Sequence, residues 1–116
     1  MTAFKILSFE DWTAFQAAGH YGGSAVDRAD GYIHMSTAAQ VPETARKHYA
    51  GRDGLMLLTI DLKAVGEGLK WEASRGGYLF PHHYADLPLA AVVASQPLAV
   101  HADGAMRFEG EAPSWA

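Results

Sequence analysis

Two segments of this chain contain the residues best suited to chemistry, and each is built around a histidine. Residues 31–37 read GYIHMST and place His34 beside side chains with hydroxyl groups. Residues 78–84 read YLFPHHY and contain His82. A histidine titrates near neutral pH and can also donate a hydrogen bond to a ligand. We expect His34 and His82 to be the candidate catalytic residues of one site, provided that the fold brings the two segments together.

The first segment predicts one wall of a pocket. Residues 32–36 have the pattern of a strand, on which Tyr32, His34 and Ser36 share a face while the apolar residues between them face the core. Thr37 follows directly and adds a second hydroxyl group. Polar groups buried on a strand need partners, and a bound ligand is one candidate partner. Tyr32, Ser36 and Thr37 are therefore candidate ligand-binding residues.

Aromatic and acidic residues later in the chain complete the predicted pocket, namely Trp71, Glu72 and Tyr84. Aromatic rings stack on bases, and a carboxylate can stabilise a developing oxocarbenium charge, so Glu72 is the third candidate catalytic residue. Each residue also has a simpler interpretation. Strand aromatics usually pack in the core, a strand histidine is usually hydrogen-bonded internally, and Glu72 beside Lys70 fits a solvated strand edge. Two histidine-aromatic segments in one small domain favour the pocket.

Other site chemistries have less support in the sequence. The six histidines include no His-x-x-x-His pair, and the adjacent His82 and His83 point to opposite sides of an extended chain, so we expect no metal site. Ser36 is two strand residues from His34, about 6–7 Å away, which is too far for its activation as a nucleophile. The chain has no cysteine, which excludes thiolate chemistry.

Length and composition predict one globular domain. The 116 residues are 49% hydrophobic and carry a formal net charge of −4. We place the core at about residues 4–109 and a tail at residues 110–116. The nine basic residues are scattered singly, which argues against nucleic acid as a partner. Neither a signal peptide nor a membrane-spanning run is found, so we expect a cytoplasmic protein without a membrane partner. The predicted pocket indicates a small molecule as the ligand. The oligomeric state stays open.

Two helices are expected in the first half of the chain. Ser8 and Gly19 delimit the first, which follows a short strand at residues 4–7. Residues 38–49 form the second, and Pro42 near its first turn kinks or delays its start.

Short strands make up the rest of the chain. The continuously apolar residues 55–61 predict a central strand buried on both faces, and residues 69–73 alternate as a second strand. Pro81 restricts residues 78–84 to a sheet edge or a loop, and Pro97 divides the C-terminal strands. This order of elements, without regular alternation of strand and helix, predicts an α+β fold.

The chain resembles the small bacterial family catalogued as domain of unknown function 952, through the blocks GYIHMSTA, LTID, KWE and FPHHY in this order and spacing. The resemblance extends over about residues 5–108. That family is similar to the ADP-ribosyltransferase fold, a split, barrel-like antiparallel or mixed sheet with two main helices, and to the branch marked by two histidines. The resemblance implies NAD or a related nucleotide as ligand. It places His34 at the position that holds the nicotinamide-side ribose and His82 at the second-motif position.

One feature of the protein-modifying transferases in that superfamily is missing from its usual place. They carry a glutamate on a late strand, whereas the matching string here is Glu109-Gly110-Glu111, at the start of the predicted tail. Three hypotheses remain open. The chain is an ADP-ribosyltransferase-like domain that binds NAD or a related nucleotide, a non-enzymatic module for a metabolite or a protein, or a hydrolase or phosphotransferase with the two histidines as acid and base. These hypotheses include both enzymatic and non-enzymatic functions, so whether the protein is an enzyme stays open.

Overall fold

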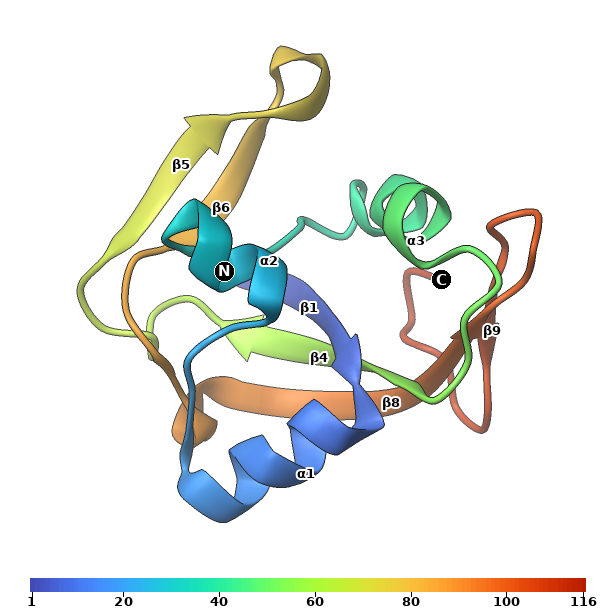
Figure 1. Cartoon of the computed structure of the whole chain (residues 1–116), viewed down its shortest axis with the longest axis horizontal. Helices are drawn as coiled ribbons and strands as arrows, with labels where there is room; N and C mark the ends of the chain where they lie inside the picture. Colours follow the sequence, from blue (N-terminus) through green and yellow to red (C-terminus); the bar gives the residue numbers. More distant parts are fainter.

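The computed structural model describes the backbone of residues 1–116 and every side chain except that of Arg75. The largest sheet is antiparallel and has four strands in the order β1-β4-β8-β9 (Figure 1). Its strands are β1 (Thr2–Ser8), β4 (Leu55–Asp61), β8 (Val92–Val100) and β9 (Met106–Phe108). The fold is therefore α+β, as predicted, and over the described residues the sheets do not close into a barrel.

A second, three-stranded sheet carries the two histidine segments. It consists of β3 (Ile33–His34), β6 (Leu79–His83) and β5 (Leu69–Ala73), in that order and all antiparallel. The short 3₁₀ turn η1 (Arg75–Gly77) joins β5 to β6. The register places His34 directly opposite His82, so the two segments do meet, as expected.

Two of the shortest strands form a third sheet. A two-stranded sheet pairs β2 (His20–Tyr21) with β7 (Leu87–Pro88). The 3₁₀ turn η2 (Leu89–Ala91) then leads into β8. Strand β3, at the centre of the first histidine segment, is also short and covers only two of the five residues expected. Ser36 nevertheless stays in the sheet system through a bridge to Phe4.

The first helix agrees with its sequence signals. Helix α1 (Phe9–Ala18) begins after Ser8, whose Oγ accepts a hydrogen bond from the backbone N–H of Asp11 at 3.0 Å. It ends at Gly19, which has a φ of 83°, a left-handed conformation that glycine adopts at little cost.

The third helix begins later than the pattern from residue 38 suggested. Helix α3 (Val41–Tyr49) has Pro42 in its first turn, where the missing N–H needs no partner within the helix. Before it, the side-chain carbonyl of Gln40 accepts a hydrogen bond from the backbone N–H of Thr37 at 2.9 Å. The delayed start that Pro42 suggested is confirmed.

A short helix, α2 (Ala25–Asp30), was not anticipated, because its six residues are too few to show an apolar period. It is fixed by a capping box, in which Ser24 Oγ accepts from the Asp27 N–H and an Asp27 carboxylate oxygen accepts from the Ser24 N–H at 2.9 Å. Gly31 ends it with a φ of 87°. This helix brings Asp27 and Asp30 next to β3.

Two prolines do not act as the sequence suggested. Pro81 lies in β6, the middle strand of its sheet, and Pro97 lies within the continuous strand β8, so the predicted edge position and the predicted division are both wrong. The carbonyls of Pro81 and Pro97 accept from the N–H groups of Met35, at 3.1 Å, and Glu109, at 3.3 Å. In a strand, the N and C=O of one residue point to the same side. The nitrogen of each proline, which carries no hydrogen, therefore faces the position just beyond the end of the neighbouring strand.

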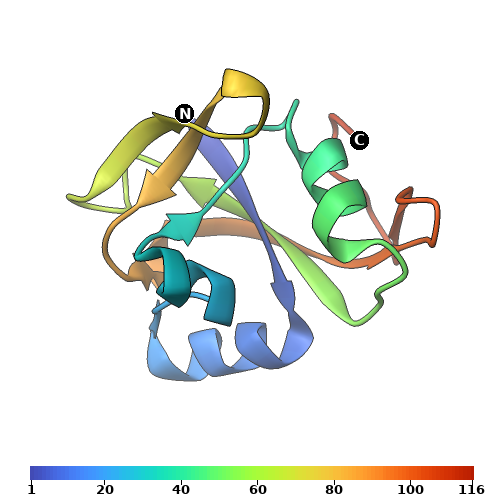
Figure 2. The same cartoon turned by 45° about the horizontal axis from the view of Figure 1, so that its top comes forward.

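The four-stranded sheet is covered on both faces, as its central strand predicted. Met56, Leu58 and Ile60 of β4 belong to the core cluster that includes the buried face of α1, while Leu55 and Leu57 belong to the cluster that includes α3. Figure 2 shows α1 and α3 on either side of β1, with the three-stranded sheet beside it. The predicted tail also contributes, because the ring of Trp115 packs edge-on against that of Phe4, with centroids 5.0 Å apart.

Candidate functional site

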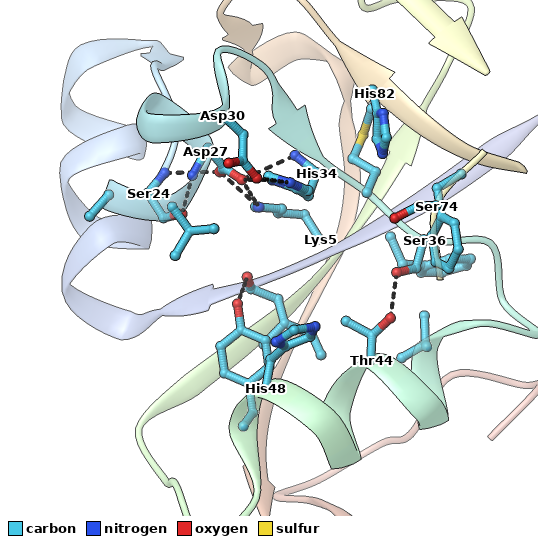
Figure 3. Close-up of a pocket in the computed structure, with 18 of the residues that line it drawn as sticks. Lys5, Ser24, Asp27, Asp30, His34, Ser36, Thr44, His48, Ser74 and His82 are labelled. Carbon is cyan, nitrogen blue, oxygen red and sulfur yellow. Dashed lines mark hydrogen bonds and ion pairs between the residues drawn. The ribbon is translucent and has the colours of Figure 1, made fainter. Parts of the chain in front are cut away.

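A cleft of about 480 Å³ lies between α2 and α3, over strand β1 (Figure 3). That volume falls in the range of small-molecule sites, about 300–1,000 Å³. Its apolar lining includes Phe4, Val41 and Phe80, and its polar and charged lining residues are Lys5, Ser24, Asp27, Asp30, His34, Ser36, Thr44, His48, Tyr49, Arg52, Ser74 and His82.

Asp27 holds one wall of the cleft together, although its side chain is only 2% exposed. Its carboxylate accepts hydrogen bonds from Lys5 Nζ at 2.8 and 3.1 Å, from His34 Nδ1 at 2.6 Å and from the backbone N–H of His34 at 3.1 Å. Gly23 makes room for it, since a Cβ there would lie 2.7 Å from Asp27 Cβ. Burial raises the pKa of Asp27, but the hydrogen bond from His34 and the charge and hydrogen bond of Lys5 outweigh it. The pKa of this carboxyl therefore lies well below its usual range.

His34 lies between two carboxylates. Its Nδ1 contacts Asp27, and its Nε2 lies 2.8 Å from a carboxylate oxygen of Asp30. A neutral imidazole has only one N–H, so both contacts are hydrogen bonds only when His34 is an imidazolium. The His34 side chain is 34% exposed and that of Asp30 is 48% exposed. A ligand that displaces Asp30 therefore reaches His34 Nε2 from the solvent side.

His82 is oriented in a similar way on the next strand. Its Nδ1 lies 2.9 Å from Oε1 of Glu72, and the same oxygen accepts a hydrogen bond from the Tyr84 hydroxyl at 2.6 Å. The hydrogen bonds from Tyr84 and His82 lower the pKa of Glu72. The hydrogen bond to Glu72 in turn raises the pKa of Tyr84 to about 12. A carboxylate on Nδ1 fixes the ring, as it does in catalytic and metal-binding histidines.

Tyr32 packs against both histidine rings. Its ring stacks on that of His82 with centroids 4.1 Å apart, and it lies 4.6 Å from the His34 ring and 5.1 Å from the Tyr84 ring. The centroids of the two histidine rings are themselves 5.6 Å apart, and their planes are inclined at 68°. The aromatic cluster thus holds the two imidazoles in a fixed relation to each other.

The opposite wall of the cleft comes from α3 and the turn after it. Thr44 Oγ1 lies 3.0 Å from Ser36 Oγ, which joins the helix to the first histidine segment by a hydroxyl pair. The Tyr49 hydroxyl donates to the Ile6 carbonyl at 3.1 Å, and the Arg52 guanidinium lies 5.1 Å from the centre of the Tyr49 ring. This wall therefore supplies hydroxyls and a cation to the same space that His34 lines.

The structure divides the predicted site residues into three groups. His34, His82 and Ser36 line the cleft. Tyr32, Glu72 and Tyr84 contact the histidines but are absent from the cleft lining, so their position suits orientation of the imidazoles rather than ligand contact.

The remaining predicted residues lie elsewhere. Trp71 pairs with Pro81, and strand alternation therefore places it on the sheet face opposite His82. Thr37 also lies outside the cleft lining, and its backbone N–H donates to the Gln40 side chain in the turn before α3. Glu109 forms an exposed ion pair with Arg107 at 3.3 Å, away from the cleft.

Sequence reasoning missed Lys5, Asp27 and Asp30. A signal for Lys5 was present, because a single lysine between apolar strand residues needs a buried partner. In the sequence, Asp27 and the Asp30-Gly31 pair indicate only a turn before the first histidine segment. Their role depends on α2, which the sequence pattern did not reveal.

Neither a metal centre nor a membrane span is found in the described part of the chain. No three His, Asp or Glu side chains with described positions are arranged to hold a metal ion. None of the described helices is long and apolar enough to cross a membrane.

Comparison with known proteins identifies relatives over most of the chain. Protein CC0527 from Caulobacter crescentus, in its X-ray crystal structure, is 46% identical, with a TM-score of 0.86 over 92% of this chain and 94% of that one. Its solution NMR structure gives 48% identity and a TM-score of 0.77 over 89% of each chain. No functionally curated protein matches the chain. The model of the family described as "Protein of unknown function (DUF952)" matches residues 6–95, and the chain therefore belongs to that family.

Proposed function

We propose that the cleft binds NAD or a related nucleotide, with His34 and His82 contacting its ribose or diphosphate. The observation that carries the proposal is that the two histidines line one cleft with ring centroids 5.6 Å apart. Imidazole N–H groups donate to hydroxyl and phosphate oxygens, which such a ligand offers in abundance. The ADP-ribosyltransferase-like interpretation of the fold belongs to this proposal, and the two histidines on adjacent strands are compatible with it.

The other lining residues support a ligand of this class. Ser36 and Thr44 offer hydroxyls for sugar oxygens, and Arg52 offers a cation for a phosphate. Among the described residues that line the cleft there is no glutamate to match the one on the late strand of the protein-modifying transferases. Asp30 is the exposed carboxylate nearest to His34 Nε2, at 2.8 Å, and is thus better placed than Glu72 to contact a bound sugar. The proposal is one of binding, and turnover is a separate measurement.

Thermal melting with added nucleotide tests the proposal. NAD or ADP-ribose is expected to raise the melting temperature of the wild-type protein, and His34→Ala and His82→Ala are expected to remove that increment. His101→Ala is the matched control, because His101 is exposed and lies outside the cleft lining, so its increment should equal that of the wild type. The absence of an increment with both nucleotides in the wild type contradicts nucleotide binding.

A second candidate is acid-base hydrolysis or phosphotransfer by the two histidines. It is favoured by the two carboxylate-histidine pairs, Asp27 with His34 and Glu72 with His82, which resemble each other in using Nδ1. It predicts cleavage of a p-nitrophenyl phosphodiester with a bell-shaped pH profile that either histidine variant loses. A flat profile rejects it. Saturable nucleotide binding without turnover instead supports a non-enzymatic binding module.

A further inference from the structure

Strand β5 is an edge strand with polar and aromatic side chains facing solvent. It pairs with β6 on one side, and among the described residues no strand lies on its other side. Lys70 and Trp71 are exposed, and Trp71 is 38% exposed although it is one of the largest apolar side chains of the protein. An open edge of this kind is a template for another strand.

The backbone of β5 has a defined set of groups that point outward. Gly68 and Ser74 direct their backbone groups toward β6, since the Gly68 carbonyl accepts from Tyr84 at 2.8 Å and the Ser74 N–H donates to Tyr78 at 3.0 Å. Backbone direction alternates along a strand, and the register of β5 with β6 is regular. The N–H and C=O groups of the odd-numbered residues therefore point away from β6, and these residues are Leu69, Trp71 and Ala73.

We propose that the free edge of β5 binds the β5 strand of a second copy of this chain, antiparallel, with Trp71 opposite Trp71. In this register the outward-pointing Leu69 and Ala73 of one copy also face Ala73 and Leu69 of the other, so each outward backbone group meets one of opposite kind. The two copies are related by a two-fold axis through the Trp71 pair, as in most homodimers. The three-stranded sheets of the two copies join into one sheet.

Charge complementarity selects this occupant over another extended peptide. In the register centred on Trp71, Lys70 of each copy lies opposite Glu72 of the other, at the positions where cross-strand side chains approach closest. A lone edge lysine discourages pairing, but a lysine and a glutamate on either side of the central residue are complementary to themselves in antiparallel pairing. The two Trp71 rings cover each other on the opposite face.

The pairing links the second copy to the histidine cleft. Glu72 already accepts from His82 and Tyr84, and Lys70 already lies 4.9 Å from the centre of the Tyr84 ring, on the same face. In the dimer a lysine of the second copy approaches the carboxylate that orients His82. The dimer therefore contributes a residue to the surroundings of the site without entering the cleft.

Sedimentation equilibrium over a protein concentration series tests the proposal. The wild type is expected to shift from monomer to dimer as concentration rises. Lys70→Glu places like charges opposite each other twice in the dimer, and is expected to weaken dimerisation by about tenfold or more. Lys63→Glu is the matched control, since Lys63 is exposed outside β5 and makes the same change of net charge. Glu72→Lys is expected to weaken the homodimer in the same way.

Mixing the two charge variants gives the sharpest outcome. The Lys70→Glu chain carries two acids at these positions and the Glu72→Lys chain carries two lysines, so the mixture should form heterodimers where neither chain pairs with itself. Ala73→Pro, which removes an outward-pointing N–H, serves as a second disrupting variant if circular dichroism shows that Glu72→Lys is unfolded. A wild type that stays monomeric at millimolar concentration overturns the proposal. A dimer that Lys70→Glu and Ala73→Pro weaken no more than Lys63→Glu does overturns it as well.

Discussion

The ammonium group of Lys5 lies 2.8 Å from a carboxylate oxygen of Asp27, and the two side chains are only 6% and 2% exposed. Removing Lys5 leaves the buried Asp27 carboxylate without its only lysine partner, so that only hydrogen bonds such as those from His34 still compensate its charge. We therefore expect Lys5→Met to lower the free energy of unfolding by about 3–5 kcal/mol, measured by urea denaturation.

The matched control for Lys5 is Arg107→Met. Arg107 pairs with Glu109 at 3.3 Å, but both side chains are more than half exposed, so water screens the pair. Arg107→Met should therefore lower the free energy of unfolding much less than Lys5→Met does. Equal losses in the two variants would mean that the Lys5 and Asp27 pair does not stabilise the fold.

Asp27 should also govern the acid limit of stability. The folded pKa of Asp27 lies below its value in the unfolded chain, so the unfolded state binds the proton first as pH falls. Its contribution is complete above about pH 4 and is lost as pH falls further, toward the folded pKa. Asp27→Asn should be less stable near neutral pH but show a flatter decline below pH of about 4. Parallel declines in acid titrations of the two proteins would contradict this assignment.

His83 should cause a second loss of stability on acidification, which begins at a higher pH than the loss caused by Asp27. Its side chain is fully buried, and burial lowers the pKa of its imidazole. The backbone groups of Asp86 and Val65 raise this pKa, but by less than burial lowers it. The neutral ring is thus favoured in the folded protein. As pH falls below about 6.5, the unfolded state takes up a proton that the folded state resists, and stability decreases. His83→Leu should remove this slope in urea denaturation, while His101→Leu should retain it.

The C-terminal segment should contribute to stability through Trp115. Its half-buried ring packs on Phe4 at the edge of the core cluster that contains α3. We expect Trp115→Ala to cost about 1–2 kcal/mol, measured by thermal or urea unfolding. Ser114→Ala, at an exposed neighbouring position, is the control. A loss for Trp115→Ala no larger than that of the control would show that the segment does not add to the core.

The elements that the sequence predicted well have local causes. Ser8 and Gly19 bound a helix through their own backbone and side-chain geometry, and the apolar residues of β4 require burial on both faces. The prolines misled because their effect depends on which neighbouring strand is present at that level of the sheet. Pro81 and Pro97 each lie beside the end of a short strand, and strand ends are not encoded at the proline itself.

The candidate site was predicted in part for the same reason. The two histidine-aromatic segments suggested one site for His34 and His82, whereas their position opposite each other on adjacent strands comes from the register of the sheet. The partner of Lys5 could not be inferred, because Asp27 is 22 residues away and is brought to it by a helix of six residues. Side chains that meet through tertiary packing alone leave no local periodic signal.

Ser36 connects the core to the cleft in two ways at once. Its backbone exchanges two hydrogen bonds with Phe4, at 2.7 and 2.9 Å, which tie the strand of the first histidine segment to β1, while its hydroxyl meets Thr44 in the cleft. Any opening of the cleft that separates the two sheets must break this pair. The amide protons of Phe4 and Ser36 should therefore exchange with deuterated solvent at the rate of that opening, and occupancy of the cleft should slow both together.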